Sequence, residues 1–158
     1  MYLPPVSWGE RMAATGDVDY QAVFDHTPSL VLVLDSGFRI VAQSRAHAAA
    51  TLSDTRGLIG KNLFEAFPDN PGDSGAAGIS LLRASLLKVL KSKQADTMPP
   101  FRYDVRRARG PFEARWRTVT NTPILGDDGY VRWIINRAED VTELMELRNR
   151  LAEAFLRK

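Results

Sequence analysis

Cysteine is absent from the 158-residue sequence. This absence excludes disulfide bonds, thiolate metal sites, cysteine nucleophiles and cysteinyl–flavin adducts. Histidine is scarce, because only His26 and His47 are present. The acidic residues are not accompanied by His-x-x-x-His, Gly-x-x-x-x-Gly-Lys or Gly-x-Ser-x-Gly spacings. The sequence therefore predicts no metal site and no catalytic residues.

Long hydrophobic runs and an excess of one charge are also lacking. No apolar stretch approaches the ~20 residues of a membrane span, and the N-terminus lacks the charged-then-apolar order of a signal peptide. The formal net charge is only +2, whereas a nucleic-acid binder more often carries a dense basic stripe. We therefore expect a cytoplasmic protein that binds neither a membrane nor nucleic acid directly.

The residues that are present suit an ordinary globular protein. Hydrophobic residues make up 44% of the chain and charged residues 25%, which is typical of soluble domains. The length is sufficient for one domain with a hydrophobic core and too short for two comfortable ones.

A hairpin near the C-terminus organises the pattern. The turn 126–129 reads Gly-Asp-Asp-Gly, and these residues supply the backbone angles of a tight turn. In the strand that follows, about Tyr130 to Glu139, apolar Val131, Trp133 and Ile135 alternate with other residues. A helix is predicted directly after this strand.

Two further strands are predicted near the N-terminus. Leu30–Asp35 is apolar on both faces, which indicates cover on both sides by the core and by either an N-terminal helix or a second subunit. Phe38–Gln43 is its hairpin partner. Short helices are expected before and after this hairpin, capped by Asp17 and Ser44 respectively, and a short helical turn is expected around Trp8–Ala14.

The middle of the chain predicts a long helix, about Ala76–Lys93, followed by strands at Phe101–Arg107 and Phe112–Thr122. The final segment, Thr142–Lys158, is a polar amphipathic helix. Its apolar residues are spaced three, four and three apart and form a short coiled-coil seam, Leu144, Leu147, Leu151 and Ala154. Two heptads are marginal alone, so this helix needs a partner helix or the sheet.

In the order of its predicted strands and helices and in its sequence motifs, the chain resembles the PAS family of sensory domains. The residues that carry the resemblance are Leu32-Val33-Leu34-Asp35, Phe38-Arg39-Ile40-Val41, Gly60-Lys61-Asn62-Leu63-Phe64, Asn121-Thr122-Pro123-Ile124 with Asp127-Asp128-Gly129, and Glu139-Asp140-Val141-Thr142-Glu143. The last of these is similar to the Asp-Ile-Thr exit motif of PAS domains that feed kinases and other effectors.

The resemblance implies an α+β fold. We expect a five-stranded antiparallel sheet in the order 2-1-5-4-3, with helices on one face, an N-terminal helical segment and a C-terminal exit helix. The implied domains are a leader at residues 1–16, a PAS domain at 17–141 and a signalling helix at 142–158. The family is not catalytic as a domain, so we expect no enzyme.

The sequence departs from two cofactor-binding branches of the family. Light-sensing members carry an Asn-Cys-Arg-Phe stretch, which this chain lacks, and the long helix contains no histidine for haem. Neither flavin nor haem is therefore expected, although an unidentified small organic ligand has room in the family's fold. We interpret His26 and His47 as surface or capping residues.

The family's strand register implies a set of inward residues around a central pocket. They are Leu32, Leu34, Leu82, Leu86, Tyr103, Val105, Arg117, Val119, Asn121, Ile134 and Asn136. An inward Arg117 would favour a carboxylate or another anion, whereas a one-residue slip would point Trp116 and Thr118 inward instead.

The exit motif also has a local interpretation. Thr142 is positioned to cap the exit helix, and Asp140 can accept hydrogen bonds from nearby backbone or from an arginine. We expect these two residues to relay a signal from sheet to helix, although a plain helix cap is the alternative.

Two functions remain open from the sequence. The first is a homodimeric sensor that binds a small molecule and controls an effector outside this chain, such as a kinase, a cyclic-dinucleotide enzyme or a DNA-binding regulator. The second is a protein–protein interaction module with a filled core and no ligand, whose sheet binds partners. In either case we expect a homodimer whose contact includes Leu144, Leu147 and Leu151.

Overall fold

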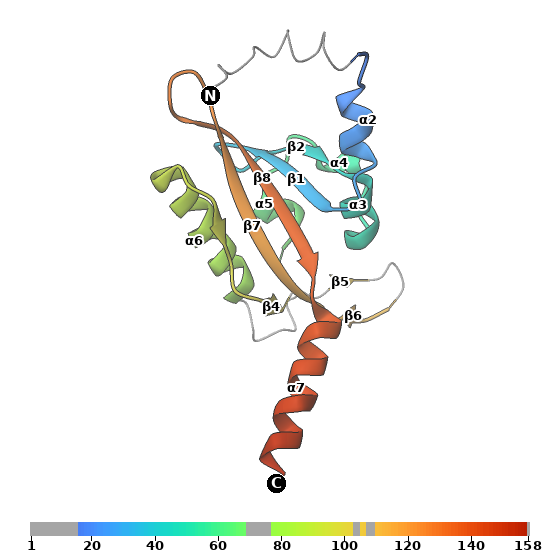
Figure 1. The fold of residues 1–158 in the computed structure, drawn as a ribbon. Helices are drawn as coiled ribbons and strands as arrows, with labels where there is room; N and C mark the ends of the chain where they lie inside the picture. Colours follow the sequence, from blue (N-terminus) through green and yellow to red (C-terminus); the bar gives the residue numbers. More distant parts are fainter. Residues whose placement is uncertain (1–15, 69–76, 103–104, 107–109, 158) are drawn as a thin grey trace.

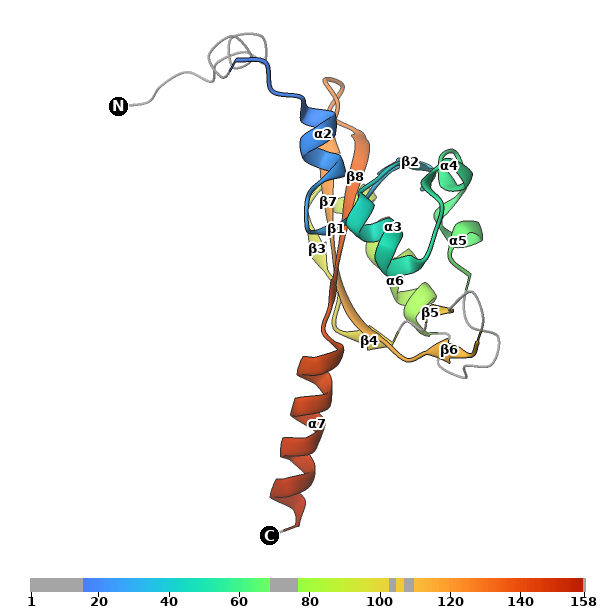
Figure 2. The same ribbon diagram turned by 90° about the vertical axis from the view of Figure 1, so that its right-hand side faces the viewer.

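The computed structural model describes residues 16–68, 77–102, 105–106 and 110–157. One antiparallel sheet forms the centre of the molecule, and helices α3 to α6 all lie on one of its faces (Figure 2). Helix α7 leaves the end of the sheet and extends away from it (Figure 1). The expected helical turn at Trp8–Ala14 lies outside the described residues.

The sheet confirms the predicted order of strands. Its order is β2-β1-β8-β7-β3, with β4 also paired to β7. All of the pairs are antiparallel, and the strands are β1 (Leu30–Asp35), β2 (Ile40–Gln43), β3 (Asp96–Thr97), β4 (Phe101–Arg102), β7 (Trp116–Leu125) and β8 (Val131–Asp140).

The edge next to β7 differs from the prediction of one continuous strand at Phe101–Arg107. It consists of two short strands, β3 and β4, separated by Pro99 and Pro100. Proline has no backbone N–H to give to the ladder, so the edge is interrupted there. The chain then forms a separate two-stranded sheet from β5 (Val105–Arg106) and β6 (Phe112–Glu113).

Polar side chains cap the N-termini of the short helices α2 and α3. Ser44 accepts a hydrogen bond from the backbone of His47 and starts α3 (Arg45–Thr51), as predicted. Asp19, rather than the predicted Asp17, caps α2 (Tyr20–Asp25). The remaining helices are α4 (Thr55–Leu58), α5 (Leu63–Ala66), α6 (Ala77–Ser92) and α7 (Thr142–Leu156).

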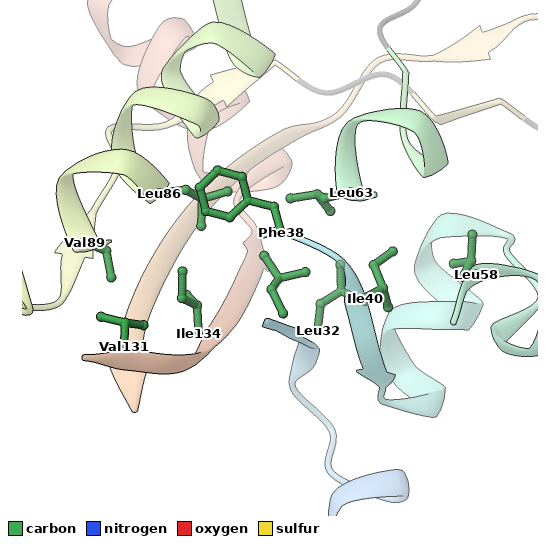
Figure 3. Close-up of a cluster of buried hydrophobic side chains, with 10 residues drawn as sticks. Leu32, Phe38, Ile40, Leu58, Leu63, Leu86, Val89, Val131 and Ile134 are labelled. Atoms are coloured by element: carbon green, nitrogen blue, oxygen red, sulfur yellow. The ribbon is translucent and has the colours of Figure 1, made fainter. Parts of the chain in front are cut away.

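The main hydrophobic core lies between the sheet and these helices (Figure 3). Leu34, Ile40, Leu86 and Ile134 each have 0% exposed surface. They meet because alternate residues of β1 and β8 face α6, whose apolar residues recur at helical spacing. A second cluster, made of Met98, Phe101, Val119 and Ala138, continues this core towards β4.

Helix α7 exposes the apolar residues of its predicted seam. Leu144, Leu147 and Leu151 are 62%, 47% and 54% exposed in the single chain. None of the described helices is both long enough and apolar enough to cross a membrane.

Candidate functional site

A cavity of about 50 Å³ lies between the inner face of the sheet and helices α3, α5 and α6. Its wall is mostly apolar, with Leu32 and Val119 from the sheet and Leu82 from α6. Four polar side chains interrupt this wall, namely His47, Thr51, Arg117 and Asn136. A mostly apolar cavity with a few convergent polar groups is the usual form of a small-ligand site.

The structure brings five of the eleven predicted pocket residues to this cavity, namely Leu32, Leu82, Arg117, Val119 and Asn136. Leu34, Leu86 and Ile134 pack in the main core instead. Asn121 is completely buried and contacts Asn136. Val105 belongs to the separate β5–β6 sheet rather than to the main sheet, and Tyr103 lies outside the described residues.

The register of β7 points Arg117 inward. Arg117 pairs with Asp140 and Asn121 pairs with Asn136 across the β7–β8 ladder, so these residues share one face of the sheet. Arg117 is only 5% exposed. The slipped register, with Trp116 and Thr118 inward, is therefore not the one adopted.

His47 is a polar cavity residue that the sequence interpretation missed. It is 4% exposed, so the expected surface or capping role is wrong for this histidine. Its burial, together with the positive charge of Arg117, lowers the pKa of the imidazole from 6.5 to about 4. The alanine-rich sequence of α3 has no apolar periodicity, so no pattern marked its inward face.

A chain of hydrogen bonds leads from the cavity wall through the core to the far edge of the sheet. Nδ2 of Asn136 donates to Oδ1 of Asn121 at 2.7 Å, and Nδ2 of Asn121 donates to Oγ of Ser85 at 2.9 Å. The hydroxyl of Ser85 donates to Asp96 at 2.7 Å, and Lys88 donates to the other oxygen of that carboxylate at 2.9 Å. We call these five residues the asparagine chain.

A second set of hydrogen bonds holds His47. Nε2 of Gln43 lies 2.8 Å from Nδ1 of His47 and donates to Oγ of Ser53 at 2.9 Å. Thr51 contacts Oγ of Ser53 at 2.7 Å and donates to the backbone oxygen of His47 at 2.8 Å. Thr55 donates to Oε1 of Gln43 at 2.7 Å. We call these five residues the glutamine cluster.

The joint between β8 and α7 is fastened by Asp140 and Thr142. Oδ1 of Asp140 accepts a hydrogen bond from the backbone N–H of Thr142 at 3.0 Å, and Oδ2 lies 3.6 Å from Nη1 of Arg115. The hydroxyl oxygen of Thr142 accepts from the backbone N–H of Trp116 at 2.9 Å. The N-cap residue is Val141, so the predicted capping role of Thr142 is wrong; its hydroxyl holds β7 instead.

Arg117 acts electrostatically on both the cavity and this joint. Partial burial alone would raise the pKa of the Asp140 carboxyl. The hydrogen bonds from Thr142 and the charges of Arg115 and Arg117 outweigh this effect and hold that pKa below its usual value. The same guanidinium lowers the pKa of His47 in the cavity. A change in the environment of Arg117 therefore alters the electrostatic field at both His47 and Asp140.

Comparison with known protein families identifies one family for this chain. The model of the PAS fold family matches residues 24–146. No curated protein matched the sequence. Among the described residues, no cluster of three or more histidine and acidic side chains is placed to hold a metal ion.

Several solved structures share this fold. A sensory box sensor histidine kinase from Vibrio cholerae is 18% identical with a TM-score of 0.53, over 85% of this chain and 98% of that one. The PAS domain of BvgS from Bordetella pertussis is 20% identical with a TM-score of 0.58, over 88% and 96%. An RNA-binding Light-Oxygen-Voltage receptor is 19% identical with a TM-score of 0.70, over 98% and 41%. The family match, the strand order and the exit helix together show that this chain belongs to the PAS fold family.

Proposed function

We propose that this PAS domain is a sensor that binds a small organic molecule in the cavity and transmits the change through α7 to an effector outside the chain. The observation that carries the proposal is the position of Arg117. It lines the cavity, and it faces Asp140 across the β7–β8 ladder at the start of the exit helix. Similarity to PAS domains of a sensor histidine kinase and of BvgS supports a signalling role.

The relay would begin with a ligand that contacts Arg117. Such a ligand changes the field that the guanidinium exerts on Asp140, and Asp140 holds the first N–H group of α7. Thr142 ties the same turn of the helix to β7. Helix and sheet would therefore shift together when the cavity is filled.

The remaining parts of the proposal concern cofactor, location and effector. The ligand is neither haem nor flavin, the domain has no catalytic role, and it works as a homodimer in the cytoplasm. The effector is a kinase, a cyclic-dinucleotide enzyme or a DNA-binding regulator.

Ala138→Leu should abolish retention of a ligand in native mass spectra of freshly purified protein. Ala138 is 5% exposed and lines the cavity, so a larger side chain occupies the space that a ligand would need. Ala42→Leu is the matched control, because Ala42 pairs with Val33 on the other face of the sheet. Wild-type protein that carries no ligand in repeated preparations would contradict the proposal.

Asp140→Ala should loosen the joint without unfolding the core. The lost hydrogen bond to a half-exposed carboxylate is worth about 1 kcal/mol, so amide hydrogen exchange in Val141–Leu151 should rise about fivefold. Exchange in β1 should change little, because its partners in the core remain. Glu139→Ala is the control, since the carboxylate of Glu139 pairs with Arg137 on the same strand. A rise throughout the sheet would show that Asp140 stabilises the core rather than the joint.

An interaction module with a filled core is the second candidate, favoured by the exposed seam of α7. Both functions predict a dimer, because a two-fold interface lets the seam cover itself. The double substitution of Leu147 and Leu151 by Glu should yield monomers in light scattering. A double variant that stays dimeric would place the interface elsewhere.

A further inference from the structure

The asparagine chain has a direction, and that direction is set at its surface end. Its three inner side chains are buried, since Asn121, Asn136 and Ser85 are 0%, 5% and 5% exposed. Their hydrogen-bonding groups are therefore satisfied by one another rather than by water. A hydroxyl has one proton, and an amide has an oxygen that accepts and an NH2 group that donates. The orientation of each member consequently follows from that of its neighbour.

Asp96 fixes the surface end of the chain, because an ionised carboxylate only accepts hydrogen bonds. Its side chain is 19% exposed, and its two oxygens receive Ser85 and Lys88. The hydrogen bond from Ser85, followed by that from Lys88, holds the pKa of this carboxyl below its usual value. Asp96 is therefore ionised at neutral pH and takes the proton of Ser85.

This fixed end determines which atom Asn136 presents to the cavity. Since its proton is given to Asp96, Ser85 only accepts, and the NH2 group of Asn121 must face it. The oxygen of Asn121 then accepts from the NH2 group of Asn136. The amide oxygen of Asn136 remains, and no described residue donates to it. Because Asn136 lines the cavity, the wall offers a hydrogen-bond acceptor there.

We propose that Asp96, acting through the asparagine chain, is a positioning residue that makes the cavity select a ligand with a hydroxyl or amide N–H opposite Asn136. This proposal rests on the proposed function, because it requires that the cavity hold a ligand. A ligand that brings only an acceptor leaves the oxygen of Asn136 unpaired, so the cavity discriminates against it. Asp96 itself does not touch the ligand.

Asp96→Asn is the variant that should reverse the chain. Asparagine has nearly the same shape, but Lys88 only donates and therefore takes the amide oxygen of the new residue. The NH2 group of that residue then donates to Ser85, which must give its own proton to Asn121. The amides of Asn121 and Asn136 turn over in succession. Asn136 then presents its NH2 group to the cavity instead of its oxygen.

Scalar couplings across the hydrogen bond between the two asparagines report this direction without any ligand. In the isotopically labelled full chain, a long-range HNCO spectrum should connect Nδ2 of Asn136 to Cγ of Asn121. In Asp96→Asn it should connect Nδ2 of Asn121 to Cγ of Asn136. Asp127→Asn removes the same charge from an exposed residue of the β7–β8 turn and should keep the wild-type coupling. An unchanged coupling in Asp96→Asn would overturn the role of Asp96.

A double variant, Asp96→Asn with Lys88→Met, separates direction from charge. It still lacks the carboxylate, but no ammonium group now holds the amide oxygen of the new residue away from Ser85. The wild-type coupling should therefore reappear in part of the molecules. If the reversed coupling persists in full, Lys88 does not orient the new amide, and the proposed chain of causes is wrong.

Isopropanol and acetone test the selection of ligands, because they share a carbon skeleton and only the alcohol donates a hydrogen bond. In titrations followed by the side-chain amide signals of Asn136, the wild type should bind the alcohol about fivefold to tenfold more tightly, the value of one hydrogen bond. In Asp96→Asn the two should bind within about twofold of each other, since an NH2 group donates to either oxygen. Asp127→Asn should keep the wild-type preference.

Two results of this titration would overturn the proposal. One is a wild-type protein that shows no preference for the alcohol, and the other is a preference that Asp96→Asn leaves unchanged. If Asp96→Asn does not fold, the direction of the wild-type coupling and the wild-type preference still decide.

Failure of this inference is separable from failure of the proposed function. If the purified protein carries a molecule that Ala138→Leu loses, but the wild-type coupling runs from Asn121 to Asn136, Asp96 does not set the wall and the sensor proposal stands. If no molecule of any kind binds in the cavity, the two probes included, the sensor proposal and the selection of its ligand are both wrong.

Discussion

Lowering the pH from 6.5 to 4 should remove roughly 3 kcal/mol from the free energy of unfolding through His47 alone. The unfolded chain takes up a proton on this residue near pH 6.5, whereas the folded protein does so only near pH 4. Between these values the unfolded state binds more protons, so stability falls as the pH falls. Above pH 6.5 this contribution is fully present and constant.

Urea denaturation at several pH values across this window measures the effect. His47→Asn should remove most of the slope between pH 6.5 and 4, because asparagine does not titrate. His26→Gln serves as the control, since His26 is the other histidine of the chain and is exposed. An unchanged slope in His47→Asn would show that His47 is not the group responsible.

Asn121→Leu should destabilise the fold by about 2–4 kcal/mol, since two buried groups lose their partner and each such loss costs roughly 1–3 kcal/mol. Asn121 is 0% exposed and joins Asn136 to Ser85. Leucine fills a similar space, so the loss comes mainly from the stranded NH2 group of Asn136 and the hydroxyl oxygen of Ser85. Thermal or urea denaturation measures the change.

Two further variants isolate the cause. Thr122→Val changes a residue that faces the other side of the same strand, and its effect should be within about 0.5 kcal/mol. The double variant Asn121→Leu with Asn136→Leu should recover part of the loss, because it also removes the stranded amide. A double variant as unstable as the sum of the two single ones would argue that packing, rather than hydrogen bonding, dominates here.

Both predictions concern residues that also bear on the cavity. His47 and Asn136 line it, and Asn121 orients the amide of Asn136. If the cavity binds a ligand as proposed, stability and ligand recognition would share the same hydrogen bonds. A variant that breaks one of the networks should lose both, whereas Arg137→Met should lose neither.

Local features of the sequence were sufficient to predict most of the helices and strands. A run that is apolar on both faces predicted β1, alternating apolar residues predicted β8, and Ser44 marked the start of α3. Gly129, with a φ of 79°, occupies the predicted tight turn. These features depend on residues within a few positions of one another, where propensity, capping and periodicity act directly. The order of the strands came from the family resemblance.

The sequence also identified part of the cavity. The family resemblance implied that Arg117 and Asn136 face inward, whereas the sequence alone left the slipped register open. In the structure Arg117, Asn121 and Asn136 share one face of the β7–β8 ladder. The third strand was predicted as one segment, Phe101–Arg107, but its two ends form β4 in the main sheet and β5 in a separate sheet, and the edge of the main sheet begins earlier, at β3.

Only the tertiary structure decided which polar groups meet. Asn121 and Ser85 are separated by 36 positions and come from β7 and α6. His47 became a cavity residue because α3 packs over β1, which no local pattern of its alanine-rich sequence indicates. The hydroxyl of Thr142 accepts a hydrogen bond from the backbone of β7 rather than capping its own helix. A hydrogen-bond partner across two elements depends on how those elements pack, and packing is determined by the whole core rather than by neighbouring residues.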